Sequence, residues 1–204
     1  LAVTALALLG IDSIAPETKN NAVLAGTSVV GSFVALAFCA WYLAAGTGQP
    51  STDGAIVLYE EALVVDGAYL FFSAIFASVA AMVAVASYDY LAGRDYQGEF
   101  YSLTMMAATG MTLMAASNSL ATAFVALELS SLPSYALVAF LKKNRGSVEA
   151  GLKYFLIGAL SSAVFVFGIS LIFAVTGSLV FGDVAEALGG TDLVGVAGVG
   201  VLMV

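Results

Sequence analysis

The chain has 204 residues, of which 61% are hydrophobic and 10% are charged, whereas soluble domains have about 45–50% apolar and about 25% charged residues. It has no histidine and one cysteine, Cys39, which excludes an intramolecular disulfide, a Cys/His zinc site and Ser-His-Asp or Cys-His catalysis within this chain. The net charge is −8, and no basic arm or patch suits nucleic acid. The composition predicts an all-α membrane protein with several spans.

Several apolar segments follow one another along the chain, each close to the roughly 20 residues that a bilayer-crossing helix needs. We expect complete spans at 21–45, 67–88, 99–117, 119–141 and 148–176. The run 1–10 is expected to be the end of a preceding span, and 193–204 the start of a following one. The connections are short, so residues 1–204 are expected to form a single transmembrane domain, a fragment of a longer polytopic bundle.

Two of the connections are predicted to form secondary structure. The run 55–66 is rich in β-branched and aromatic residues and predicts a short β-hairpin. The run 182–189 predicts a short helix at the membrane surface. Asp183 lies near its N-terminus, where an acid is favourable for the helix dipole.

The cations fall on one side of the predicted bundle. All six lie in, or next to, alternate connections: Lys19, Arg94, Lys142, Lys143, Arg145 and Lys153. The positive-inside rule makes this side, including the Lys142-Lys143-Arg145 loop, cytoplasmic. The opposite connections have acids and no cation: Asp53, Glu60, Glu61, Asp66, Asp183, Glu186 and Asp192. Such acidity favours the cell membrane of a prokaryote, and of a salt-loving one, although it also occurs as ordinary variation.

Glu128 is the one acid that lies away from the connections and from the ends of the predicted spans, and the bounds 119–141 put it near the bilayer midplane. An ionisable side chain at that depth costs about 2.5–3.5 kcal/mol or more on insertion scales unless it is paired or hydrated. Intramembrane acids are usually functional, so the position favours a proton-handling carboxyl. The alternative is a protonated side chain that hydrogen-bonds a neighbouring helix.

A polar stripe continues from Glu128 along the same helix. Ser131 and Tyr135 recur at i+3 and i+7, and Lys142 is expected to continue this face two turns further. Pro133 removes one helical hydrogen bond and leaves the backbone beside Glu128 open to water or another donor. The two hydroxyls also fit a seam between packed helices.

Lys153 lies two turns inside the next predicted span, with Glu149 four residues before it as a favourable helical ion pair. One interpretation is a lysine that extends toward the membrane surface and is anchored by Glu149. The other is a lysine that faces the bundle interior and exchanges a proton as its surroundings change. Ser161 is expected on the same face.

The segments FVALELSSLPSYALVAF (124–140) and KKNRGSVEAGLKYFLIGALSSAVFVFGISLIFAVTGS (142–178) resemble the N subunit of proton-translocating NADH-quinone oxidoreductase, respiratory complex I. More widely they resemble the antiporter-like subunits L and M and the Mrp cation/proton antiporter subunits. The resemblance is specific over 100–178. Leu127 precedes Glu128, where L and M usually have Trp, and this favours N.

The resemblance implies about fourteen spans in two inverted repeats. It implies that Glu128, in the fifth span, pairs with a lysine of the seventh span, and that Lys153 belongs to the same mid-membrane polar axis. From their positions next to Glu128, Ser131, Pro133 and Tyr135 are expected to support this proton path. The last cation of this sequence is Lys153, so the expected partner is not in it.

The resemblance also implies an enzyme subunit that performs no redox chemistry itself. The chain has no GxGxxG motif before a helix and no cysteine cluster, so no cofactor is expected in it. Quinone, flavin and iron–sulfur clusters are expected in partner membrane and peripheral subunits, with quinone as the substrate of the complex. The alternatives are an Mrp-type cation/proton antiporter subunit and a membrane scaffold with a vestigial site.

Overall fold

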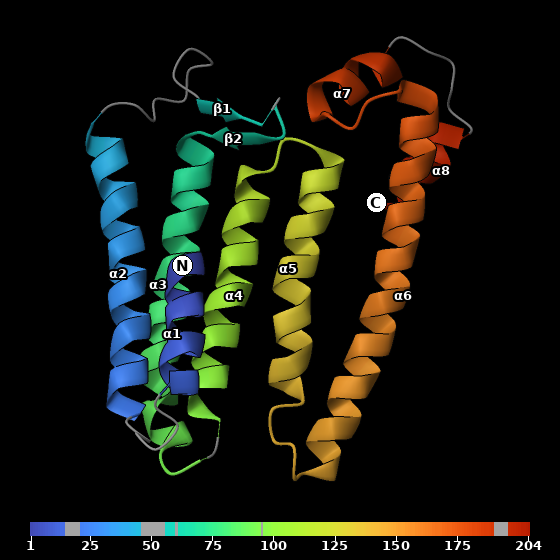
Figure 1. Cartoon of the computed structure of the whole chain (residues 1–204). Coiled ribbons are helices and arrows are strands. Elements are labelled where there is room, and N and C mark those ends of the chain that lie inside the picture. Colours follow the sequence, from blue (N-terminus) through green and yellow to red (C-terminus); the bar gives the residue numbers. More distant parts are fainter. Residues whose placement is uncertain (15–20, 46–55, 60, 95, 190–195) are drawn as a thin grey trace.

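The computed structural model describes residues 1–14, 21–45, 56–59, 61–94, 96–189 and 196–204, and these form a helix bundle with one small hairpin (Figure 1). The helices are α1 Ala2–Ile14, α2 Asn21–Ala44, α3 Gly67–Leu91, α4 Gln97–Ala116, α5 Leu120–Val138, α6 Arg145–Thr176, α7 Phe181–Gly189 and α8 Val196–Met203. The strands are β1 Ile56–Leu58 and β2 Leu63–Val65. The predicted all-α class is confirmed.

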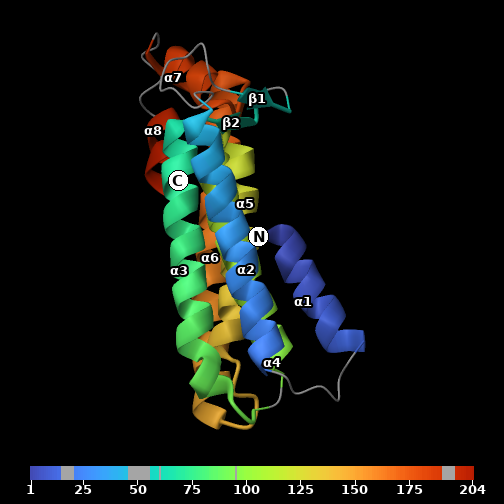
Figure 2. The same cartoon turned by 90° about the vertical axis from the view of Figure 1, so that its left-hand side faces the viewer.

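Among the described residues, four helices are long and apolar enough to cross a membrane: α2, α3, α5 and α6. α4 has 20 residues but does not reach the same apolarity, although the sequence predicts a span at 99–117. The central place of α4 in the bundle explains its lower apolarity. α4 contacts α1, α2, α3 and α5, so other helices rather than lipid cover much of its surface (Figures 1 and 2).

Polar side chains of α4 are buried in this centre. Tyr101 is fully buried, and its hydroxyl donates to Oδ1 of Asn21 on α2 at 3.0 Å. Asn21 Nδ2 in turn donates to the carbonyl of Tyr88 on α3 at 2.5 Å. A buried polar group needs such partners, and here they tie one end of three helices together.

Side-chain caps fix where three helices begin. Asp66 accepts from the backbone N–H of Tyr69 at 2.7 Å and caps α3, and Ser119 accepts from Thr122 at 3.2 Å and caps α5. Asn144 accepts from Gly146 at 2.9 Å and caps α6. These residue types suit an N-cap because a short side-chain oxygen reaches a backbone N–H that has no helical partner.

The predicted hairpin and surface helix are both present, at the same end of the bundle (Figure 1). β1 and β2 are antiparallel, with Ile56 opposite Val65. The tight turn between α4 and α5 joins them to α7 through Asn118. Its backbone N–H donates to Ala62 at 3.0 Å, its Nδ2 donates to the carbonyl of Glu61 at 3.0 Å, and its carbonyl accepts from Phe181 at 3.0 Å. We call this the hairpin end.

The cations that the structure describes lie at the opposite end, where α3 joins α4 and α5 joins α6 (Figure 1). They are Arg94, Lys142, Lys143, Arg145 and Lys153. Four described acids belong to the connections on the other side and lie at the hairpin end, where the described residues include no cation: Glu61, Asp66, Asp183 and Glu186. Lys19, Asp53, Glu60 and Asp192 lie outside the described residues. The one-sided charge pattern of the sequence therefore holds for the described part of the chain, and we call this second end the cation end.

Candidate functional site

Glu128 lies in the middle of α5. It is eight residues after Leu120 and ten before Val138, or about 12 Å and about 15 Å along the helix axis. The helix is one of the four that can cross a membrane, so the acid lies deep between two apolar halves. Its side chain is half-buried.

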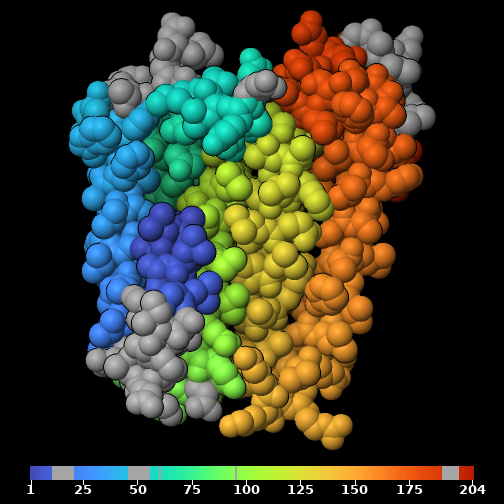
Figure 3. All heavy atoms as spheres, viewed as in Figure 1, coloured from blue at the N-terminus to red at the C-terminus, as the bar shows by residue number. Residues whose placement is uncertain are grey.

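The partner of Glu128 is a hydroxyl from the next helix. Ser162 Oγ of α6 donates a hydrogen bond to Oε1 of Glu128. Both residues line a groove of about 660 Å³ between α5 and α6, the seam between yellow and orange in Figure 3. The rest of the lining is largely apolar: Phe124, Leu132, Phe155, Val166 and Phe167. A carboxyl is thus held by one described hydrogen bond in a largely apolar groove.

Tyr135 lines the same groove nearer the cation end. Its ring packs edge-to-face on Tyr154, with centroids 4.8 Å apart, and on Phe155 at 5.7 Å. Its hydroxyl lies against Gly158 of α6, where a Cβ would overlap it. The predicted alignment of Glu128 and Tyr135 on one face is therefore present.

Ser131 and Pro133 shape the helix rather than the groove. The Ser131 hydroxyl donates to the carbonyl of Leu127 at 2.8 Å, and the Ser134 hydroxyl donates to that of Ser130 at 2.8 Å. Pro133 is buried. The hydroxyls bond carbonyls on either side of Leu129, whose own helical donor the proline removes.

The opposite side of α5 lies hard against α4. Gly110 of α4 approaches the α5 backbone so closely that a Cβ there would overlap Ser130 N and come within 2.8 Å of Leu129 C. These two residues directly follow Glu128. The contact fixes the axial position of α5 relative to α4 at the level of Glu128.

Lys153 is not in contact with Glu128 in the described structure. Its Nζ lies 2.5 Å from Oε1 of Glu149, and its side chain is 69% exposed. It precedes Ser162 by nine residues, which is about 13 Å along α6. The predicted ion pair between Lys153 and Glu149 is present. Tyr135 contacts α6 at Gly158, which lies between Lys153 and Ser162 along the helix. Ser161, the expected companion of Lys153, is also exposed and donates to its own helix at Ile157, 3.0 Å.

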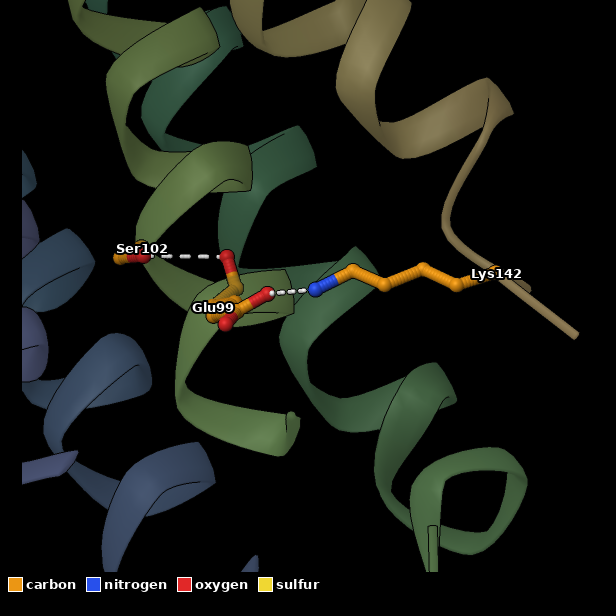
Figure 4. A network of polar contacts seen from close by, with 3 residues as sticks. All are labelled: Glu99, Ser102 and Lys142. Carbon is orange, nitrogen blue, oxygen red and sulfur yellow. Dashed lines mark hydrogen bonds and ion pairs between the residues drawn. The ribbon is translucent and has the colours of Figure 1, made fainter. Parts of the chain in front are cut away.

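Lys142 does not extend the stripe on α5, and this corrects the sequence prediction. The helix ends at Val138, so Lys142 lies in the connection. Its Nζ lies 3.0 Å from Oε2 of Glu99 on α4 (Figure 4). The same Nζ lies 3.8 Å from the ring centre of Tyr96. Figure 4 also shows Ser102, whose hydroxyl donates to the carbonyl of Glu99 at 3.0 Å.

Three residues of the site were missed from the sequence: Ser162, Gly158 and Gly110. A chain rich in serine and glycine gives many such candidates, and none has a motif that marks it. Groups of three or more His, Cys, Asp or Glu side chains able to hold a metal ion do not occur among the described residues.

The family model for the transmembrane part of NADH:quinone oxidoreductase and Mrp antiporters matches residues 117–204, which include α5, α6 and the groove between them. An NADH-quinone oxidoreductase subunit N of Koribacter versatilis is 33% identical over 189 residues, 92% of this chain and 38% of that protein. The chain belongs to the NADH:quinone oxidoreductase/Mrp antiporter family of membrane subunits. The sequence-based family prediction is confirmed.

Two further proteins are similar to this chain and support the family assignment. An F420H2 dehydrogenase subunit N of Methanosarcina mazei is 34% identical over 168 residues, 81% of this chain and 33% of that protein. A chain of respiratory complex I from Thermus thermophilus superposes with a TM-score of 0.71 at 30% identity, over 98% of this chain and 41% of that one.

A chain of an archaeal membrane-bound sulfane sulfur reductase superposes with a TM-score of 0.79 at 21% identity, over 98% of this chain and 41% of that one, and shows a shared fold. The chain thus spans about a third to two fifths of the length of the relatives it matches.

Proposed function

We propose that this chain is part of a proton-translocating membrane subunit, of the N type, in a quinone-reducing complex. The observation that carries the proposal is a carboxyl in the middle of a membrane-length helix, hydrogen-bonded by Ser162 within a largely apolar groove. The names of the relatives, NADH-quinone oxidoreductase subunit N and F420H2 dehydrogenase subunit N, support the type of complex.

In the proposed mechanism Glu128 accepts and releases the transported proton. The Ser162 hydroxyl orients the carboxylate and stabilises its charge, because a hydrogen bond to an ionised acceptor is about twice as strong as a neutral one. Water that enters the α5–α6 groove links Glu128 to the Tyr135 hydroxyl and onward to the Lys153–Glu149 pair nearer the cation end. A lysine of the seventh span, implied by the family resemblance, completes the charge pair with Glu128.

The remaining chemistry belongs to other chains in this proposal. Partner membrane subunits flank the bundle, and lipid covers its exposed apolar faces. Quinone is the substrate of the complex, and flavin and iron–sulfur clusters are held by partner subunits. The cation end faces the cytoplasm of a prokaryote, and the acidic hairpin end suits a salt-rich exterior.

The deciding experiment replaces Glu128 with Gln in the full-length gene, in its native membrane. Quinone-reductase activity and the proton gradient that it generates are measured together. We expect the Glu128→Gln complex to assemble and to lose at least about tenfold of its proton transport, in line with the contribution of a proton-transferring side chain. Glu186→Gln, an exposed acid of α7, is the matched control and should leave both quantities unchanged. An unchanged gradient in the Glu128→Gln complex would remove this residue from the proton path.

Lys153 needs a test of its own because it is exposed. Lys153→Gln is compared with Arg145→Gln, a cation of the same helix and the same membrane end. A role in the proton path requires that Lys153→Gln lowers the ratio of protons moved to quinone reduced, while Arg145→Gln leaves it unchanged. Equal ratios in both variants would leave Lys153 a surface anchor.

A second candidate function is an Mrp-type cation/proton antiporter subunit, because the matching family model covers both groups. Purification distinguishes the two. A subunit of a quinone-reducing complex co-purifies with quinone reductase activity. An antiporter subunit does not, and it exchanges cations for protons in vesicles without any electron donor. A scaffold role predicts normal transport in the Glu128→Gln complex.

A further inference from the structure

Toward the hairpin end, the α5–α6 groove meets a cluster of apolar side chains. Phe124 lines the groove one turn beyond Glu128, and its ring stacks on that of Phe165 of α6, with ring centres 5.9 Å apart. Buried aliphatic residues from α5, α6 and α7 pack with this aromatic pair. We call the group the hairpin-end cluster: Leu120, Phe124, Phe165, Ile169, Ile172 and Val184. The function proposed above gives it no role.

The members of the cluster follow one another along both helices. Phe124 is four residues from Glu128, about 6 Å along α5, and Leu120 lies one turn further toward the hairpin end. On α6, Ile169 lies one turn beyond Phe165 in the same direction. Leu120 and Ile169 are both buried. The cluster therefore closes the seam between α5 and α6 over about two helical turns beyond Glu128.

The short helix α7 covers the outer side of this cluster (Figure 1). Val184 is buried in the cluster, and Leu188, one turn later, packs against it. The acids Asp183 and Glu186 of the same helix are exposed. Backbone hydrogen bonding at Asn118 holds the start of α7 in this position. α7 is thus an amphipathic helix that separates a charged surface from the apolar seam.

The lining of the groove also reaches Ser170, on the exposed flank of α6. The Ser170 hydroxyl donates to the carbonyl of Phe167 in its own helix at 2.7 Å. In the function proposed above, lipid and partner subunits cover such exposed flanks. The direct passage from Glu128 to the hairpin end is the seam under α7, and this passage is the one that the hairpin-end cluster fills.

Water in this seam would have a direct effect on proton transport. In the proposed function, water links Glu128 to Tyr135 and the cation end. A second water chain, from Glu128 through the seam to the hairpin end, would complete a continuous path for protons across the membrane and dissipate the gradient. Hydrophobic constrictions prevent such chains, because water inside them loses hydrogen bonds that apolar walls do not replace.

We propose that the hairpin-end cluster is a barrier to water, which keeps a proton on Glu128 from passing along the seam to the hairpin end. The stacked Phe124–Phe165 pair is its first layer, and the buried aliphatic residues under α7 are its second. The importance of the barrier for proton transport rests on the function proposed above, whereas the exclusion of water from the seam can be measured by itself.

The first test measures water access at a reporter thiol in the whole complex, reconstituted in sealed vesicles. Ala163→Cys places the thiol in the groove lining, next to Ser162. A charged methanethiosulfonate reagent is added on the hairpin-end side, and labelling is followed by mass spectrometry. Adding Phe165→Ala should speed labelling at least about fivefold, the factor that corresponds to one regained hydrogen bond of average net strength. Phe173→Ala, the same change at an exposed position of α6, should leave the rate unchanged.

A second variant covers the case in which the helices collapse onto the space left by Phe165. Ile169→Thr keeps the β-branched shape of the side chain and adds a hydroxyl that can hold water in the seam. Quinone-reductase activity of each sample reports assembly of the complex. Unchanged labelling in both Phe165→Ala and Ile169→Thr would overturn the proposal, and so would an equal increase in Phe173→Ala.

The last measurement separates the barrier from the proposed function. Passive proton entry into the same vesicles is driven by a potassium diffusion potential, without an electron donor, and reported by a trapped pH dye. Phe165→Ala should raise this entry at least about fivefold, and the further change Glu128→Gln should return it to the wild-type rate. Faster thiol labelling together with proton entry that does not depend on Glu128 would support the barrier and reject Glu128 as the proton carrier. The two proposals therefore fail in different measurements.

Discussion

The two sides of α5 differ in how closely they are packed. On the α4 side, Gly110 brings two backbones into direct contact beside Leu129 and Ser130. On the α6 side, a groove of about 660 Å³ separates the helices, and Glu128 faces it. Small residues let membrane helices approach closely, where van der Waals packing stabilises their association. The α5 backbone next to Glu128 is therefore fixed by direct contact on the α4 side, whereas the Glu128 side chain faces an open groove on the α6 side.

The largest expected effect comes from disturbing the close side. Gly110→Ala adds one Cβ that meets backbone atoms of Ser130 and Leu129, and the backbone has little freedom to move away. We expect a loss of stability of about 3 kcal/mol. The measurement is the thermal midpoint of the purified complex, together with its amount in the membrane.

Gly26→Ala is the control, because a Cβ at this α2 glycine meets nothing within 4 Å. Its thermal midpoint should equal or slightly exceed that of the wild type, because alanine stabilises a helix interior relative to glycine. If Gly110→Ala behaves in the same way, the close contact between α4 and α5 does not stabilise the bundle.

The next largest effect is expected on the open side, from the hydroxyl that bonds Glu128. Ser162→Ala removes the donor and leaves the carboxyl without its described partner. Hydrogen bonds to charged groups are worth about 1.5–3 kcal/mol, so proton transport should fall about tenfold or more while the complex still assembles. Ser161→Ala, one position away and bonded to its own helix, should leave transport within about twofold of wild type. Equal transport in both variants would contradict a role for Ser162.

A smaller effect is expected from adding a Cβ on the open side. Gly158→Ala meets the hydroxyl end of the Tyr135 side chain rather than backbone. The ring can tilt away from Tyr154 and Phe155, so the loss of stability should be about 1 kcal/mol, well below that of Gly110→Ala. The thermal midpoints of the two glycine variants, measured side by side, give the difference in packing directly. Equal shifts would mean that the two sides of α5 are equally rigid.

The smallest effect belongs to the ion pair that ties the connection after α5 to α4. A double-mutant cycle with Glu99→Gln and Lys142→Gln should give a coupling energy of about 0.5 kcal/mol, since both side chains are exposed. It should decrease further in high salt. A coupling above about 2 kcal/mol would show that this pair, and not the glycine contact, holds α5 to α4.

Much of the fold was predictable because length and apolarity decide it. The depth of Glu128 followed from the apolar residues on either side, and the hairpin at 56–65 followed from its β-branched residues. The short helix α7 was expected at 182–189 and begins at Phe181. Each of these features depends on residues near one another in the sequence.

The rotation and the exact ends of helices were not predictable. α6 is apolar all round, so no amphipathic pattern says which of Ser161 and Ser162 faces α5. Lys142 was placed on the helix because the apolar run continues to Leu141, but α5 ends at Val138. Lys153 has the exposure of a surface lysine in the described structure, and its part in proton transfer stays a prediction.

The two ends of α5 are held in different ways, and at the hairpin end Asn118 makes most of the contacts. Through this one residue the hairpin, the turn from α4 to α5 and the start of α7 share backbone hydrogen bonds, and Leu120 adds another to Leu179 at 2.9 Å. At the cation end, α5 continues directly into the short connection to α6, where the Ser147 hydroxyl donates to the carbonyl of Val138 at 2.8 Å, and the exposed Lys142–Glu99 contact links this connection to α4. Both ends of α5 are therefore held. A widening of the α5–α6 groove would have to come from bending of the helices between these ends, at the level of Glu128 and Ser162, rather than from a rotation of α5 about either end.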